Sequence, residues 1–209
     1  MASLPIPPLE PLLAILDMAG VAVFAVSGAL AAARIKQTIV TFAFFAAITG
    51  IGGGTLRDLL IGAPVFWVGR SDYLGICLVA AAAVWLLKAD RWRLDALLWF
   101  DALGLGAYSV LGAAKALSLG VPALPSVIMG VLTASFGGIV RDLLAGEPSI
   151  LLRREIYVSA AALGAGIYVG LTLLGLSLWP AALIGAAAGF GLRGLAIATG
   201  LALPGYRDD

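Results

Sequence analysis

The sequence predicts an all-α integral membrane protein with seven transmembrane helices, arranged as a 3+3 inverted-topology repeat followed by a seventh helix. Of the 209 residues, 62% are hydrophobic and only 12% are charged, whereas soluble domains carry about 25% charged residues. Apolar runs of about 20 residues, long enough to span a bilayer, recur along the chain. The chain also matches itself without gaps at an offset of 84 residues.

Seven spans are expected, separated by short segments that contain Gly, Pro or charged residues. In chain order they are 12–33, 39–61, 72–88, 96–118, 123–146, 155–175 and 179–200. A membrane β-barrel would instead show segments of about 10 residues with alternating polarity. Because the runs are longer and rich in Ala, Leu and Gly, helices are favoured.

The composition argues against several classes of function. The chain has no histidine, one cysteine and a net charge of +1. It therefore lacks the commonest metal ligand and the usual general base near neutral pH, and the charge gives no support for nucleic-acid binding. No nucleophile–base pair or phosphate-binding loop is apparent. We expect no enzyme activity, no tightly bound metal and no cofactor.

Basic residues predict the orientation, because loops rich in Lys and Arg stay in the cytoplasm. With the N-terminus outside, eight basic residues fall on the cytoplasmic side and only Arg70 on the other. The eight are Arg34, Lys36, Lys88, Arg91, Arg93, Arg153, Arg154 and Arg207. We therefore expect an outside N-terminus and a cytoplasmic C-terminus.

The two repeats cover residues 12–88 and 96–175. Between Thr49 and Pro64, nine of sixteen positions are identical to those 84 residues later, and the identities are Gly, Pro and charged residues as well as apolar ones. Each copy holds three spans, so the second copy enters the membrane upside down. Transport proteins with such repeats place their site near the midplane, at the repeat interface. The seventh helix (179–200) lies outside the repeat.

The second and fifth spans each carry a glycine run followed by an Arg-Asp pair. An interior glycine destabilises a helix by up to about 1 kcal/mol relative to alanine. We therefore expect a kink or local unwinding in both spans, facing a water-filled pathway; close helix packing is the alternative. The residues concerned are Gly52, Gly53, Gly54, Arg57 and Asp58 in the first copy and Gly137, Gly138, Arg141 and Asp142 in the second.

The two Arg-Asp pairs lie within the spans, where a charge costs at least about 2.5–3.5 kcal/mol on insertion scales. Sequence neighbours on a helix point about 100° apart. We therefore expect pairing between the copies, Arg57 with Asp142 and Arg141 with Asp58. The charges either line a pathway or only fasten the two halves together.

Four further ionisable residues lie within the predicted spans. Asp17 and Asp101 occupy matching places near the starts of the first and fourth spans, where a carboxylate either caps a helix or belongs to a pathway. Lys115 has no counterpart, since the first copy has Ala31 there. It either snorkels to the outer interface or sets a local field in a pathway. Arg193, near the cytoplasmic end of the last helix, is expected to snorkel.

These motifs resemble the prokaryotic TRIC (trimeric intracellular cation) channel family, which is also filed as an uncharacterised inner-membrane family with a glycine transporter domain. The resemblance extends over about residues 12–200. It implies a homotrimer in the lipid bilayer of a prokaryotic inner membrane, with one pore in each protomer. The implied permeating ions are monovalent, chiefly K⁺ with Na⁺ as a second ion. The kinked second and fifth helices would line this pore together with the first and fourth.

Two departures and one alternative accompany the resemblance. Phe136 replaces the first glycine of the triplet in the second copy, so the two kinks are expected to differ. Lys115 is the only basic residue left of the lipid-binding motif that animal relatives carry in the fourth span. From the residues alone, a secondary transporter for a small zwitterion such as glycine fits equally well, because an Arg-Asp pair could hold its carboxylate and its ammonium.

Overall fold

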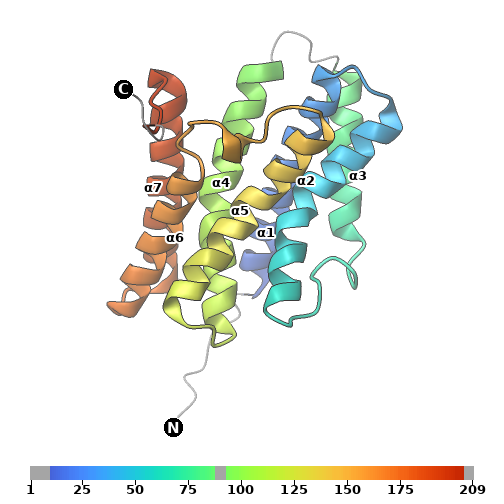
Figure 1. Cartoon of the computed structure of the whole chain (residues 1–209). Helices are drawn as coiled ribbons and strands as arrows, with labels where there is room; N and C mark the ends of the chain where they lie inside the picture. Colours follow the sequence, from blue (N-terminus) through green and yellow to red (C-terminus); the bar gives the residue numbers. More distant parts are fainter. Residues whose placement is uncertain (1–9, 88–92, 205–209) are drawn as a thin grey trace.

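The computed structural model describes the backbone of residues 10–87 and 93–204 and the side chains of residues 17–87 and 95–204. Seven α-helices lie in these ranges (Figure 1), and the all-α prediction is confirmed. They are α1 (Glu10–Arg34), α2 (Ile39–Leu60), α3 (Asp72–Leu86), α4 (Arg93–Ser118), α5 (Ala123–Leu144), α6 (Val158–Leu173) and α7 (Leu178–Thr199). Some of the basic residues that predict the orientation lie outside these described ranges, namely Lys88, Arg91, Arg207 and the side chain of Arg93.

Five of these helices, namely α1, α2, α4, α5 and α7, are long and apolar enough to cross a membrane. The other two, α3 and α6, occupy the same place in the two repeats and have only 15 and 16 residues. The fifth and sixth helices are joined by residues 145–157, which include a short 3₁₀ turn, η1 (Ile150–Leu152). Because this linker extends to Tyr157 without α-helical structure, α6 begins at Val158 rather than at the predicted residue 155.

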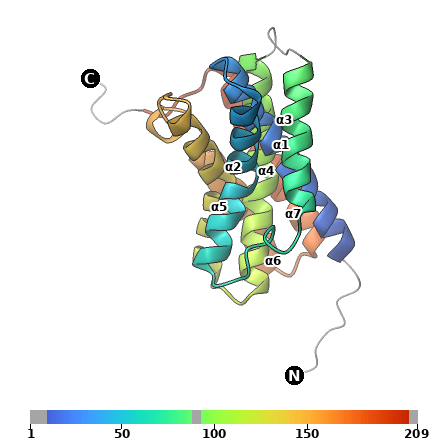
Figure 2. The ribbon, with the colours of Figure 1, turned by 90° about the vertical axis from the view of Figure 1, so that its right-hand side faces the viewer.

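Four helices form the centre of the bundle. Helix α1 contacts α2, α4 and α5, and α5 also contacts α2 and α4, while α3 packs on α1 and α2. Helix α6 packs on α4 and α5, and α7 packs on α4 and α6 (Figures 1 and 2). The linkers 35–38 and 145–157 lie at the end of the molecule where α7 finishes, and the linkers 61–71, 119–122 and 174–177 lie at the opposite end.

Equivalent positions of the two repeats make equivalent contacts between α1 and α4. A β-carbon added at Gly20 would lie 1.9 Å from the Tyr108 ring, and one added at Gly104 would lie 2.9 Å from the Phe24 ring. Gly104 and Tyr108 follow Gly20 and Phe24 by 84 residues each. The rings of Phe24 and Tyr108 also meet edge to face, with centroids 5.3 Å apart. The two helices are thus packed by a reciprocal exchange of aromatic rings and glycines.

The ends of α2 and α5 are also built alike. Gly62 and Gly146 directly follow the two helix caps with φ values of 68° and 70°, a left-handed conformation that glycine adopts without strain. The next amide of each turn bonds back to the helix, from Ala63 to Asp58 O and from Glu147 to Asp142 O. The repeated Gly-x-Pro therefore stops both helices one turn after their Arg-Asp pair.

Candidate functional site

Helices α2 and α5 cross at the glycines that the sequence singles out. A β-carbon added at Gly53 would lie 2.0 Å from the carbonyl oxygen of Thr133, and one added at Gly137 would lie 2.3 Å from that of Thr49. The two helices therefore touch backbone to backbone, as glycine packing allows. Both are α-helical throughout, so the glycines are not locally unwound. A bend at the glycines stays a prediction.

The flanking glycines differ in their surroundings. A β-carbon at Gly54 would meet the Phe66 ring at 2.6 Å, and one at Gly138 would meet the Tyr157 hydroxyl at 2.9 Å. Gly52, by contrast, has only the α-carbon of Gly137 at 4.0 Å. Close approach therefore requires glycine at four of the five predicted positions, and Gly52 is the one with space.

In the first repeat, the Arg-Asp pair forms within its own helix. The Nε atom of Arg57 donates to Asp58 Oδ1 at 2.8 Å, and the Nζ atom of Lys115 donates to the same oxygen at 2.8 Å. The other carboxylate oxygen accepts from the backbone amide of Phe66 at 3.0 Å. Arg57 is 3% exposed and Asp58 is fully buried. We call Arg57, Asp58 and Lys115 the first-half cluster.

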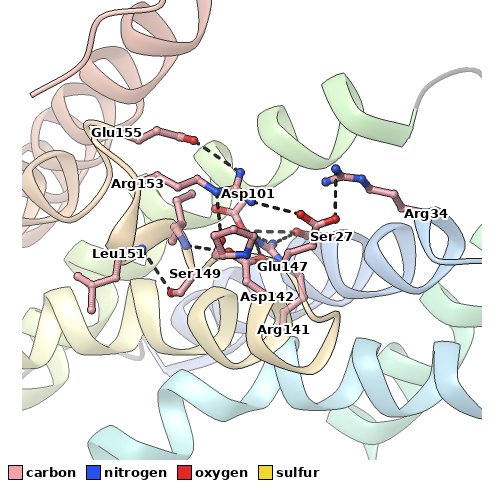
Figure 3. Close-up of polar contacts among 12 residues, drawn as sticks. Ser27, Arg34, Asp101, Arg141, Asp142, Glu147, Ser149, Leu151, Arg153 and Glu155 are labelled. Carbon is pink, nitrogen blue, oxygen red and sulfur yellow. Dashed lines mark hydrogen bonds and ion pairs between the residues drawn. The ribbon is translucent and has the colours of Figure 1, made fainter.

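The second repeat has the same pairing (Figure 3). Arg141 donates to Asp142 Oδ1 through Nε at 3.0 Å and Nη2 at 2.8 Å, and its Nη1 lies 2.5 Å from Asp101 Oδ1. The Ile150 amide donates to Asp142 Oδ2 at 3.0 Å. We call Asp101, Arg141 and Asp142 the second-half cluster; Ser27 also accepts from Arg141.

The predicted pairing between the copies is therefore wrong. Each arginine bonds to the aspartate that follows it, because the long guanidinium side chain curls back over the 100° separating neighbouring residues. The two clusters lie near the C-terminal ends of α2 and α5, at opposite ends of the molecule. The inverted arrangement thus separates the groups that were expected to meet.

Asp17 and Asp101 do not cap their helices. Helix α1 begins at Glu10 and α4 at Arg93, so both carboxylates lie about two turns inside. Asp17 accepts hydrogen bonds from the hydroxyls of Tyr73 at 2.8 Å and Tyr108 at 3.2 Å, whereas Asp101 binds Arg141. Equivalent carboxylates therefore have phenolic partners in one half and a guanidinium in the other.

Two cavities adjoin the clusters, and their sizes differ tenfold. The larger, of about 290 Å³, is lined by Asp17, Arg57, Lys115, three apolar residues and Ser118 of the last turn of α4. The smaller, of about 30 Å³, is lined by Arg141, Asp142 and residues of the 145–157 linker. One water needs about 10–15 Å³ by such a measure. The cavity of the first half therefore has room for many waters, and that of the second has room for two or three.

Lys115 and Arg193 both point into the protein. Lys115 is 32% exposed and reaches Asp58 from the wall of the larger cavity, which favours a place in a pathway over snorkelling. Arg193 is 2% exposed, and its Nη2 lies 2.6 Å from Glu155 Oε2, so the expected snorkelling is wrong. A partly exposed acceptor, Glu155, lets α7 keep an arginine inside the bundle.

The sequence interpretation missed the tyrosines of the site. Tyr73 and Tyr108 hold Asp17, and Tyr157 lies on Gly138. Tyr73 and Tyr157 are 84 residues apart, so their identity within the repeat was the available signal. Tyr108 carried no such signal, because its counterpart is Phe24.

Comparisons with known proteins agree with this architecture. The family model described as "Glycine transporter" matches the chain twice, over residues 14–89 and 98–173, and the two matches begin 84 residues apart. A UPF0126 membrane protein of Vibrio cholerae is 39% identical over 201 residues, covering 93% of this chain and 83% of that protein. A UPF0126 membrane protein of Bacillus subtilis is 40% identical, covering 77% of this chain and 81% of its own.

Solved structures of TRIC channels share the fold. The TRIC trimeric intracellular cation channel orthologue from Rhodobacter sphaeroides is 43% identical, with a TM-score of 0.88, over 92% of this chain and all of that one. A second TRIC cation channel structure is 29% identical with a TM-score of 0.83, over 94% of this chain and 98% of that one. The chain therefore belongs to the glycine transporter family of membrane proteins, and within it to the prokaryotic TRIC channels that its sequence resembles.

Proposed function

We propose that the protein is a passive channel for monovalent cations, chiefly K⁺, with one pathway in each protomer of a homotrimer. The observation that carries the proposal is the 290 Å³ cavity, which is lined by Asp17 and Arg57 of the first repeat and by Lys115 of the second. Solved relatives are cation channels, which supports a transport rather than an enzymatic role.

The charges of the two halves suit a cation better than an anion. The second-half cluster has one arginine and two aspartates, so its formal charge is −1. In the first half, Asp17 and Asp58 balance Arg57 and Lys115. Carboxylates along a pathway attract cations, while the arginine of each pair lowers the cost of burying them. With Asp17 counted alongside the first-half cluster, neither group of buried charges is net positive, so neither repels K⁺.

The pathway is closed in this conformation. The backbone contact at Gly53 and Gly137 leaves no space for an ion between α2 and α5. Conduction therefore requires these two helices to separate, or to bend, at the glycines. The four central helices α1, α2, α4 and α5 then line the route, which leads from the larger cavity to the second-half cluster.

Lys115 blocks the larger cavity in this conformation. Its ammonium occupies the position beside Asp58 Oδ1 that a permeating cation would take. The corresponding residue in the first repeat is the small, buried Ala31, so the block exists on one side only. Movement of Lys115 away from Asp58 would make the Asp58 carboxylate accessible to a permeating ion.

As part of this proposal, the protein lies in a bacterial inner membrane with its N-terminus outside and the 145–157 linker in the cytoplasm. Relatives in Escherichia coli are named inner membrane proteins. The orientation follows from the basic residues, of which Arg34, Lys36, Arg153 and Arg154 belong to the end where α7 finishes.

Flux into proteoliposomes tests the function against the carrier alternative. The carrier alternative has glycine as its substrate, because the matching family model is described as a glycine transporter. If the protein is a channel, a K⁺ gradient without added solute produces a diffusion potential across the vesicle membrane, which a voltage-sensitive dye reports. Saturable glycine uptake without such a potential would instead identify a carrier and overturn the proposal.

A further inference from the structure

Helix α7 stands outside the repeat, yet it places one buried arginine on the second half. Arg193 donates through Nη2 to Glu155 Oε2 at 2.6 Å and through Nη1 to the carbonyl of Ile156 at 3.3 Å. Its guanidinium carbon also lies 5.3 Å from the centroid of the Tyr157 ring. All three partners belong to the 145–157 linker, so α7 holds this linker through one side chain.

Tyr157 continues the contact toward the second-half cluster. It is 1% exposed, and a β-carbon added at Gly138 would lie 2.9 Å from its hydroxyl oxygen. The same β-carbon would lie 3.5 Å from Asp101 Oδ1 and 3.6 Å from Arg141 Nη2. Arg193, Tyr157, the backbone at Gly138 and the second-half cluster are therefore neighbours, in this order, from α7 to α5.

The first half has the same arrangement with a different arginine. Tyr73, the counterpart of Tyr157, lies under Arg70 at 5.1 Å, and Arg70 binds Asp72 at 2.6 Å. The side chains of Arg70 and Asp72 are 45% and 43% exposed. In one half, then, a solvent-screened pair between the linker and the first residue of α3 lies over the tyrosine. In the other, a buried arginine from α7 does so.

The difference between the two arginines parallels the difference between the two cavities. The half whose tyrosine lies under exposed Arg70 contains the 290 Å³ cavity, and the half whose tyrosine lies under buried Arg193 contains the 30 Å³ one. The segment after α7 strengthens the second half further, because Leu203 N donates to Arg154 O at 2.8 Å. Freeing a buried arginine from its acceptors is much harder than freeing an exposed one.

We infer that Arg193 is a positioning residue that keeps Tyr157 on the second-half cluster and so holds this end of the pathway closed. Helix α7 then has a defined role: it makes two equivalent halves open unequally. The inference rests on the proposed function only where it concerns conduction. Its structural part, closure of the smaller cavity, holds whether the protein is a channel or a carrier.

The accessibility of an introduced thiol tests whether the smaller cavity is closed, independently of ion conduction. Ala31 lines the smaller cavity, so Ala31→Cys in a Cys77→Ala background reports on it. In lipid nanodiscs, a positively charged thiol reagent should modify position 31 at least about tenfold faster when Arg193→Gln is added, since the closed population falls. Arg70→Gln, the matched control in the other half, should leave this rate unchanged. Equal acceleration by both variants, or by neither, overturns the inference.

Single-channel recording tests the consequence for conduction. Arg193→Gln should raise the open probability severalfold and leave unit conductance and reversal potential unchanged, and Arg193→Lys should restore part of the closure. Should Arg193→Gln not yield a folded protein, Glu155→Gln removes the main partner from a less buried position and should act in the same direction. An unchanged modification rate in folded Glu155→Gln protein would then overturn the inference. Absence of current from the unmodified protein would defeat the proposed function alone.

Discussion

Alanine at Gly53 should separate the two halves of the molecule. The added β-carbon would lie 2.0 Å from the backbone oxygen of Thr133, where ordinary contacts begin at 3.4 Å. Because the obstacle is backbone, α5 itself must move. Overpacking of this kind destabilises a protein by about 1–3 kcal/mol, against a gain of up to about 1 kcal/mol in helix propensity. A distance of 2.0 Å is a severe overlap, so we take the upper end of the overpacking range and expect a net loss of about 2 kcal/mol in the free energy of unfolding.

Gly52→Ala is the matched control in the same run. A β-carbon there has 4.0 Å to its nearest neighbour, so only the gain in helix propensity applies. The two variants differ by about 3 kcal/mol, so at about 2–4 °C for each kcal/mol in a chain of this size they should melt about 6–12 °C apart, with Gly53→Ala lower. Thermal unfolding in detergent, followed by size-exclusion chromatography, measures this. If both variants melt together, the close crossing of α2 and α5 is refuted.

Three further predictions concern the charged groups. Lys115→Ala should unblock Asp58 and raise the K⁺ over Cl⁻ permeability ratio, measured from reversal potentials, whereas Lys115→Arg should not; a lower ratio would contradict the blocking role. Arg141→Ala leaves Asp101 and Asp142 buried without their guanidinium and should destabilise the protein by about 3–5 kcal/mol. Arg34→Ala, which breaks a half-exposed 3.4 Å pair, should cost under about 1 kcal/mol, and equal melting of these two variants would count against the buried cluster. Tyr73→Phe removes one hydrogen bond to Asp17 and should cost about 1 kcal/mol in thermal unfolding; no loss would show that Asp17 does not depend on Tyr73.

The helices and the repeat were predictable because hydropathy and identity are local properties of the sequence. The matched Gly53 and Gly137 already indicated a special relation between α2 and α5. Whether such glycines unwind a helix or allow another backbone to approach depends on the neighbour, which the sequence does not contain. The contacts with Thr133 O and Thr49 O decide for close approach.

The partners of the charged groups were harder to predict. Angular separation on a helix wheel suggested that Arg57 could not bind Asp58, but that argument treats a side chain as a direction and ignores the reach of arginine. The burial of Arg193 depends on Glu155, which lies 38 residues away and on a different helix connection. Ion pairs of this kind become visible only once the fold brings the segments together.

Single-channel recording of the reconstituted protein in a K⁺ gradient tests most directly whether ions cross each protomer between its two repeats. Three independent pathways in a homotrimer predict up to three equally spaced current levels that share one reversal potential. A single, indivisible level would instead indicate one central pore between protomers, and the buried clusters would then lie off the pathway.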